Sequence, residues 1–98
     1  MDEQCHVEPL QKTATPDERG HTTWKVLAVQ GMGCPNCAAR VRNSLISLNG
    51  VIEAYVDHVI GLADVEFNPT RVTIPALIAA VARAGGDGRH EYRARLLE

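Results

Sequence analysis

Aromatic residues, long apolar runs and charge of one sign are all scarce in this 98-residue chain. Only 4% of its residues are aromatic and its net charge is −2, so it lacks the basic, aromatic-rich patches that bind nucleic acid. No apolar run approaches the roughly 20 residues that a membrane-spanning helix needs. Residues 1–4 are acidic or polar with no apolar stretch behind them, which is not typical of a secretory signal. We expect a cytoplasmic protein that binds no nucleic acid and does not insert into a membrane.

Cysteine is also scarce, yet two of the three cysteines lie close together, in the run GMGCPNC at residues 31–37. We call residues 31–37 the cysteine loop. Thiolates are soft ligands that select Cu(I), Zn(II) and other thiophilic metals. A helix start stabilises anions and lowers the pKa of a cysteine placed there. In a reducing compartment, the pair Cys34 and Cys37 therefore indicates either metal binding or thiol redox chemistry, not a structural disulfide.

The first part of the chain differs from the rest in composition. Residues 1–21 contain Pro9, Pro16 and many polar groups without an apolar period, which predicts a flexible N-terminal tail. Cys5 and His6 belong to this tail. We expect the folded domain to comprise residues 22–98.

Apolar periodicity in the remaining chain predicts alternating strands and helices. The segments are a strand at 23–30, a helix at 35–48, a hairpin at 51–67, a helix at 74–84 and an edge strand at 90–97. Trp24 is expected to pack on the sheet and not to serve as a ligand platform. Both helices must bury an apolar stripe, and one antiparallel sheet offers the surface for both. This predicts an α+β, ferredoxin-like βαββαβ sandwich with a four-stranded antiparallel sheet and two helices on one face.

The cysteine loop resembles the GMxCxxC signature of heavy-metal-associated domains. These domains occur as copper chaperones, as N-terminal modules of metal-transporting P-type ATPases and in mercury-resistance proteins. The resemblance spans roughly residues 23–97 and includes Phe67-Asn68-Pro69 at the end of the hairpin. It implies the same βαββαβ fold, a metal site at Cys34 and Cys37, and a Met32 that anchors the loop instead of binding metal.

The chain departs from the family pattern at Gly33, where the family often has Thr or Ser, or Asp in some zinc-type members, and again after the second predicted helix. After Ala84-Gly85 many members carry an aromatic residue, and many copper chaperones place a tyrosine or lysine near the metal from this connection. Here Gly86 and Asp87 follow. The group near the metal is therefore missing from this chain or comes from another segment.

The resemblance implies a binding and transfer module without catalytic activity. Two thiolates from one loop can approach the near-linear geometry that Cu(I) tolerates, whereas Zn(II) prefers four tetrahedral ligands. Cu(I) is the favoured metal, and Zn(II), Cd(II) or Hg(II) in a detoxification system are the alternatives. The expected partner is another CxxC domain or a metal-transporting P-type ATPase. A metal ion shared between two copies would also give a bridged homodimer.

One alternative function and one question about the tail stay open beside the metal-binding prediction. The sequence Cys-Pro-Asn-Cys also resembles the glutaredoxin motif, which would make Cys34 the nucleophile and Cys37 the resolving thiol of a thiol-disulfide oxidoreductase. The helical spacing of residues 76–81 opposes it, because a strand follows the corresponding proline in glutaredoxins. Separately, Cys5 and His6 are either part of a tail without a role or auxiliary metal ligands that fold over the cysteine loop.

Overall fold

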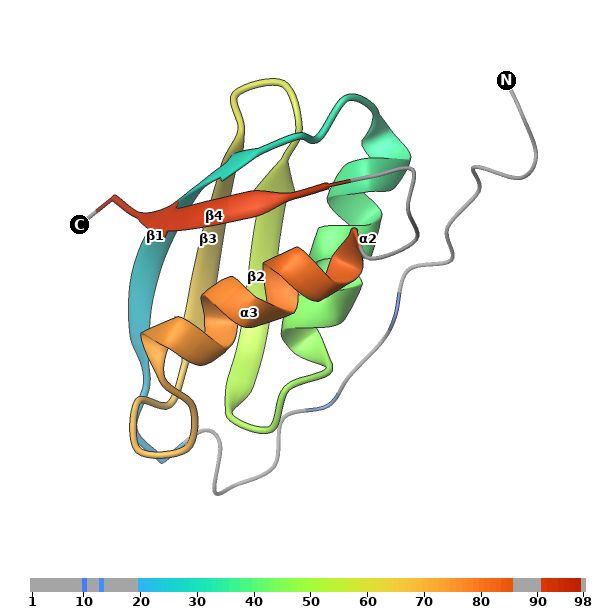
Figure 1. The fold of residues 1–98 in the computed structure, drawn as a ribbon. Helices are drawn as coiled ribbons and strands as arrows, with labels where there is room; N and C mark the ends of the chain where they lie inside the picture. Colours follow the sequence, from blue (N-terminus) through green and yellow to red (C-terminus); the bar gives the residue numbers. More distant parts are fainter. Residues whose placement is uncertain (1–9, 11–12, 14–19, 86–90, 98) are drawn as a thin grey trace.

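The chain folds as the sequence predicts, in the order strand, helix, strand, strand, helix, strand. The computed structural model describes Leu10, Thr13 and residues 20–85 and 91–97, so most of the predicted tail, with Cys5 and His6, lies outside the described residues. The elements are β1 (Thr23–Gln30), α2 (Pro35–Ile46), β2 (Val51–Asp57), β3 (Leu62–Phe67), α3 (Ile74–Ala84) and β4 (Arg93–Leu96) (Figure 1).

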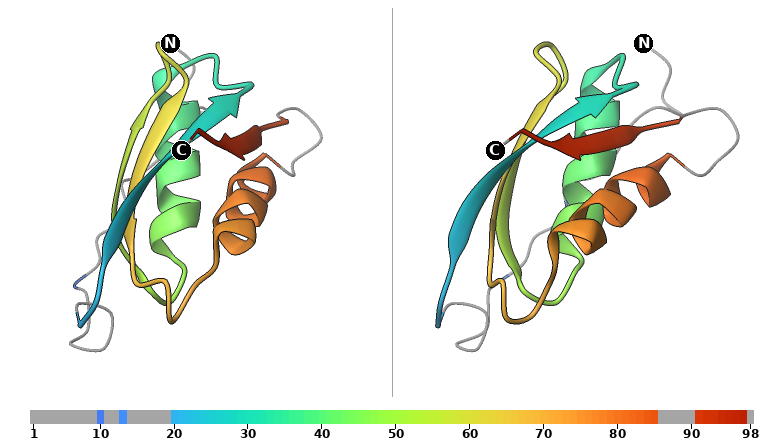
Figure 2. Two further views of the ribbon diagram at one scale, coloured as in Figure 1. Left: turned by 90° about the vertical axis from the view of Figure 1, so that its left-hand side faces the viewer. Right: turned by 60° about the vertical axis from the view of Figure 1, so that its left-hand side comes forward.

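The four strands form one antiparallel sheet in the order β2-β3-β1-β4. Both helices cover the same face of the sheet and leave the other face open (Figure 2). The ferredoxin-like fold and the edge position of β4 are therefore confirmed. Neither helix that the described residues form has the length and apolar character needed to cross a membrane.

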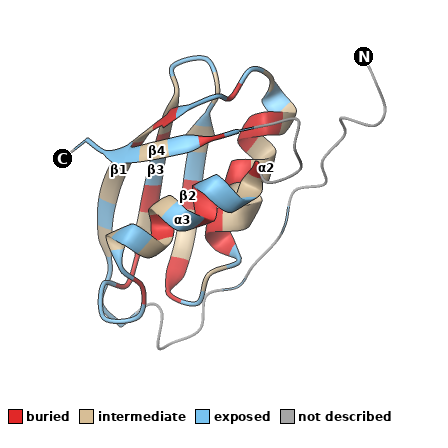
Figure 3. Ribbon diagram, viewed as in Figure 1, coloured by how far each residue is buried: buried red, intermediate tan, exposed pale blue. Residues whose placement is uncertain are grey.

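The core lies between the sheet and the two helices (Figure 3). Alternate strand residues point into it, and each helix adds an apolar stripe. Its fully buried members include Leu27, Val41, Leu45, Ala63, Val65, Leu77, Ala80 and Val81. Burying one such Leu or Val side chain stabilises the fold by about 1.5–3 kcal/mol. This core fixes the start of α2 against the end of β1, which is where the cysteine loop lies.

The helix ends follow local chemistry. Pro35 opens α2, where its missing N–H has no intrahelical partner to lose. The hydroxyl of Thr73 accepts a hydrogen bond from the backbone N–H of Ala76 at 3.3 Å, so the predicted N-cap of α3 is confirmed. α2 ends at Ile46, not at the predicted residue 48, because Leu48 bonds back to the carbonyl of Leu45 in a tighter turn.

The segment before β4 is pressed against the cysteine loop. Gly31 has a φ of +101°, and a Cβ atom there would run into the carbonyl oxygen of Glu91. Glycine is required at this position for both reasons. The final strand begins at Arg93, later than the predicted residue 90, so Tyr92 precedes the strand and lies beside the loop.

Candidate metal centre

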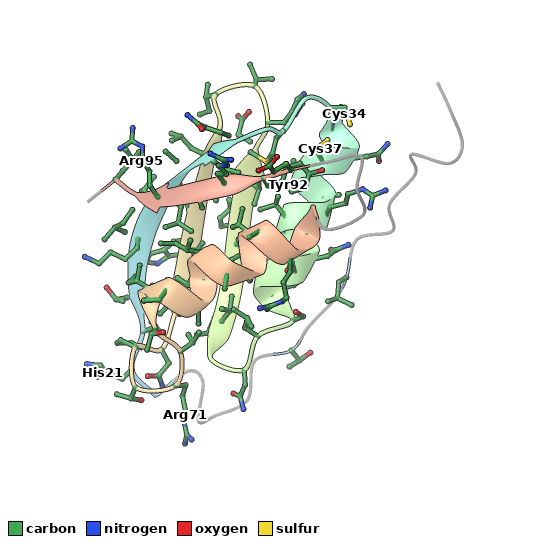
Figure 4. The ribbon with its side chains drawn as sticks, viewed as in Figure 1. His21, Cys34, Cys37, Arg71, Tyr92 and Arg95 are labelled. Carbon is green, nitrogen blue, oxygen red and sulfur yellow. The ribbon has the colours of Figure 1, made fainter. Side chains whose placement is uncertain are left out.

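The two cysteines of the loop meet at the N-terminus of α2 (Figure 4). Cys34 is the N-cap residue, with an extended backbone (φ −156°, ψ 166°), and Cys37 lies in the first turn of the helix. One helical turn brings residues three apart onto the same side. The two Sγ atoms consequently lie 3.2 Å from each other.

The two thiols differ in their exposure to solvent. Cys37 is only 3% exposed and belongs to the hydrophobic core, whereas Cys34 is half-buried. Gly33 and Pro35, which flank Cys34, are both exposed. A ligand arriving from solvent therefore meets Cys34 first, with Cys37 beneath it.

The helix start supplies a favourable field for negative charge. The carbonyl of Cys34 accepts hydrogen bonds from the N–H groups of Cys37 (3.0 Å) and Ala38 (3.4 Å). The first turn of α2 contains no acidic residue, and the Cys34 side chain makes no capping hydrogen bond. The positive end of the helix dipole thus faces the site without a competing carboxylate, which favours the binding of negatively charged groups there.

Tyr92 contacts the buried sulfur from the segment before β4 (Figure 4). Burial raises the pKa of the Cys37 thiol. Hydrogen bonds from Tyr92, from Cys34 and from the backbone outweigh this effect and lower the pKa from 9.0 to about 7. The thiolate form of Cys37 is therefore reached at a lower pH than in an ordinary cysteine.

Tyr92 itself is held as a neutral donor. Its side chain is only 1% exposed, and burial together with the contact to Cys37 raises the pKa of its phenol above the ordinary 10.0. At neutral pH its hydroxyl carries a proton that it can donate to the Cys37 thiolate.

Sequence reasoning missed this role of Tyr92. Tyr92 lies within the edge strand predicted at residues 90–97, and nothing in that prediction gave it a role at the metal site. The family's aromatic residue was sought directly after Gly85, where Gly86 and Asp87 stand. The signal that could have identified it is that Tyr92 is the first aromatic residue after α3.

Met32 carries a thioether, a group that could also act as a ligand for a soft metal ion. Its side chain is 8% exposed and belongs to the same buried cluster as Leu27 and Val41. This burial agrees with the predicted anchoring role. Among residues 20–85 and 91–97, no cluster of three or more His, Cys, Asp or Glu side chains could hold a metal ion. The described part of the site is thus a pair of sulfurs, and Cys5 and His6 lie outside it.

Comparison with known proteins gives consistent matches. A sequence model of the heavy-metal-associated domain matches residues 26–87. The copper chaperone CopZ of Staphylococcus epidermidis is 35% identical over 65 residues, covering 66% of this chain and 96% of that protein.

Solved structures share the fold over most of their length. A copper-binding domain from HMA7, a P-type ATPase, has a TM-score of 0.69 and 29% identity over 76% of this chain and 93% of that one. The N-terminal domain of a potential copper-translocating P-type ATPase from Bacillus subtilis, solved in its Cu(I)-loaded state, has a TM-score of 0.67 and 29% identity. That match covers 76% of this chain and 86% of the Bacillus domain.

Proposed function

Because this chain belongs to the heavy-metal-associated domain family, we propose that it binds one Cu(I) ion through Cys34 and Cys37 and passes it to a partner protein. The ion is the cargo and not a resident cofactor. The observation that carries this proposal is the pair of sulfurs 3.2 Å apart at a helix start, one of them accessible and the other buried.

The two-sulfur arrangement supports Cu(I) over Zn(II). A zinc ion prefers four ligands in a tetrahedron, whereas the described residues offer two thiolates. With metal–sulfur bonds of about 2.3 Å, an ion coordinated linearly by the two sulfurs would hold them about 4.6 Å apart. Because the sulfurs are now 3.2 Å apart, their separation must then increase by about 1.4 Å. Gly33 allows this movement, because a Cβ there would meet no atom within 4 Å.

Transfer follows from the unequal exposure of the two sulfurs. A partner thiolate can approach on the solvent side, bond to Cu(I) and replace Cys34 while Cys37 still holds the ion. A second partner thiolate then replaces Cys37, so that the number of metal–sulfur bonds never falls below two. The natural recipient is another CxxC domain, including one in a metal-transporting P-type ATPase. No catalytic activity is part of this function, and we place it in the cytoplasm, where both cysteines stay reduced.

The test is metal transfer between two separately labelled proteins. Chain loaded with Cu(I) under anaerobic conditions is mixed with a CxxC domain of a copper-pumping ATPase, and copper on each protein is measured after separation. We expect copper to equilibrate between the two within the mixing time. Donor that retains its copper against an excess of recipient would contradict a transfer role, even if binding is tight.

The oxidoreductase hypothesis receives less support from the same geometry. It assigns the attacking role to Cys34 and the resolving role to Cys37. The thiol whose pKa is lowered is Cys37, which is only 3% exposed and would be the resolving thiol in that mechanism. Residues 74–84 form a helix where a glutaredoxin has a strand.

We also propose that Cys5 or His6 can add a ligand to the site. The backbone N–H of Leu10 donates to Asn43 Oδ1 (2.9 Å), and its carbonyl accepts from Arg42 Nη1 (3.0 Å), which fixes Leu10 on α2. Asn43 lies about 9 Å along the helix from Cys37. Five residues of extended chain span up to about 17 Å, so Cys5 is within reach of the sulfurs.

Replacing both residues tests this extension. In a Cys5→Ser/His6→Ala variant, we expect Zn(II) affinity to fall at least tenfold while one Cu(I) still binds at Cys34 and Cys37. Unchanged Zn(II) affinity and stoichiometry would contradict a ligand role for Cys5 and His6. That outcome would not affect the proposal that Cys34 and Cys37 bind the metal.

A further inference from the structure

The sheet face that no helix covers carries an apolar strip between opposite charges. One row, at the end of the sheet beside the β2–β3 hairpin, crosses all four strands in register: Asp57 on β2, Leu62 on β3, Ala28 on β1 and Arg95 on β4. Neighbouring strands are about 4.8 Å apart, so the row is about 15 Å long. One end of the row is anionic, the other is cationic, and the middle is apolar.

The surroundings of the row extend the same pattern. Tyr55 and Trp24 stack with ring centroids 6.0 Å apart and planes 11° apart, yet they remain 62% and 49% exposed. The predicted packing of Trp24 on the sheet is thus confirmed. Ile60, at the hairpin tip, is 63% exposed. These aromatic and aliphatic side chains share the open face with the carboxylates of Asp64 and Glu66 on β3, which lie opposite Tyr55 and Trp24 in the strand register, and no other described part of the chain covers them.

Two hollows lie on either side of Ile60 and carry opposite charges. One, of about 470 Å³, is lined by Tyr55, Asp57 and Asp64, together with Arg42, which is already paired with Glu53 at 3.4 Å. The other, of about 430 Å³, is lined by Arg93 and Arg95. Within the described residues the ion pairs involve Arg42 and Arg93, so Arg95 has no described carboxylate partner (Figure 4).

We infer that this open face, which we call the charged sheet face (Asp57, Leu62, Ala28, Arg95 and the Trp24–Tyr55 pair), docks a second copy of the same chain. A twofold axis parallel to the strands, lying between two facing sheets, places β4 of one copy over β2 of the other. Arg95 then meets the partner's Asp57 twice by symmetry, and Leu62 meets the partner's Ala28. An axis across the strands and along this row would instead stack β2 on β2 and place like charges together, so charge selects the first arrangement.

The geometry has a consequence for the cysteine loops. Because the axis runs along the strands, β1 points the same way in both copies, and the two loops emerge at the same end of the dimer. The interface lies on the sheet face opposite the helices, so both cysteine pairs stay open. This pairing needs no metal, which separates it from a metal-bridged dimer through Cys34 and Cys37.

The size of the face predicts a weak dimer. Four strands and about six residues of each give a projected area on the order of 350 Å² per copy. Stable interfaces bury about 800 Å² per partner, so we expect a weak dimer that forms only at high protein concentration. The pairing should weaken further in high salt, because its ion pairs remain near solvent.

Charge reversal in two separate variants gives the decisive test. Sedimentation of the full chain is measured from about 10 μM to 1 mM with reductant and chelator, which remove metal and disulfide bridges. Arg95→Glu alone and Asp57→Arg alone should each lower self-association at least tenfold, since each places like charges together twice. An equimolar mixture should associate again as a heterodimer, because both ion pairs return with their signs intact.

Two controls keep this test interpretable. Asp57 Oδ1 accepts from the N–H groups of Val59 (2.8 Å) and Ile60 (3.3 Å), so Asp57→Asn removes the charge while keeping this turn, and should also weaken pairing. Arg83→Glu makes the same charge change on the exposed face of α3 and should have no effect. Trp24, the single tryptophan, reports association by a blue shift in its emission.

The result that supports the inference is concentration-dependent dimerisation that the two variants lose and their mixture regains. A wild-type chain that stays monomeric at 1 mM, or a mixture that associates no better than either variant alone, would overturn it. Neither outcome depends on whether the chain binds copper.

Discussion

The phenol of Tyr92 and the thiol of Cys37 interact electrostatically within the core, although Cys37 belongs to the first helix and Tyr92 precedes the last strand. The pair ties the cysteine loop to the C-terminal part of the fold. It also contributes to the lowered pKa of the buried thiol, because a neutral phenol beside the sulfur favours the thiolate form. The metal-free loop therefore already favours the anionic form of Cys37, which is the form that binds a cation.

Removing only the phenol oxygen should raise the pKa of Cys37. In Tyr92→Phe the ring still fills its place in the core, but the hydrogen bond that lowers the pKa is lost while burial continues to raise it. We expect an increase of roughly one unit or more from the wild-type value. Titration of the Cys37 Cβ chemical shift by NMR measures it directly. A value that stays near 7 in the variant would show that the backbone and Cys34 supply the whole effect.

The same pair predicts how stability depends on pH. The pKa of Cys37 is about 7 in the folded chain and ordinarily 9.0, so its stabilising contribution is complete above pH 9 and is lost as the pH falls through 7. The pKa of Tyr92 is raised, so its contribution is present below its ordinary 10.0 and is lost at higher pH. The free energy of unfolding of the metal-free chain should rise by up to about 2 kcal/mol between pH 7 and 9.

Urea denaturation at a series of pH values measures this rise. The Cys37→Ser variant is the control, because a hydroxyl does not titrate in this range. The explanation fails if the variant shows the same rise as the wild-type chain.

Two glycines of the cysteine loop should respond differently to alanine. Gly31→Ala combines a φ of +101° with a clash against the Glu91 carbonyl, and should destabilise the fold by about 3 kcal/mol. Gly33→Ala places its Cβ in open space, so its cost should stay within about 0.5 kcal/mol. Equal losses for both variants in urea denaturation would mean that the loop does not close on the segment before β4.

Met32 should matter for stability and not for metal affinity. Met32→Ala leaves a cavity in the core cluster and should cost about 2–4 kcal/mol of unfolding free energy. The Cu(I) affinity of the variant should stay within about threefold of wild type, a difference below 1 kcal/mol. A loss of affinity as large as that caused by removing a cysteine would instead identify Met32 as a ligand.

Much of the fold followed from the sequence because its signals are local. Alternating apolar residues identified the strands, and Thr73 with Pro75 identified the start of α3. The end of α2 was placed too late, because Leu48 continues the apolar period but closes a tighter turn. Leu48 fits the apolar period whether the chain continues as an α-helix or closes a tighter turn. The periodicity therefore cannot distinguish the two conformations at this residue.

The site was predicted only in part because one of its members is not local. The spacing of Cys34 and Cys37 within one helical turn brings their sulfurs together, and the sequence alone shows that. The approach of Tyr92 depends on how β4 pairs with β1 and on the close contact at Gly31. Those are tertiary contacts between distant segments, and no local pattern in the sequence reports them.

The most direct test of the central claim is an anaerobic competition titration of the reduced chain with Cu(I) against a chromogenic chelator. The wild-type chain is compared with the Cys34→Ser/Cys37→Ser variant, and native mass spectrometry gives the stoichiometry. We predict one tightly held Cu(I) per wild-type chain and none competing with the chelator in the variant. Weak Cu(I) binding by the wild-type chain, or binding that survives the loss of both cysteines, would contradict the account.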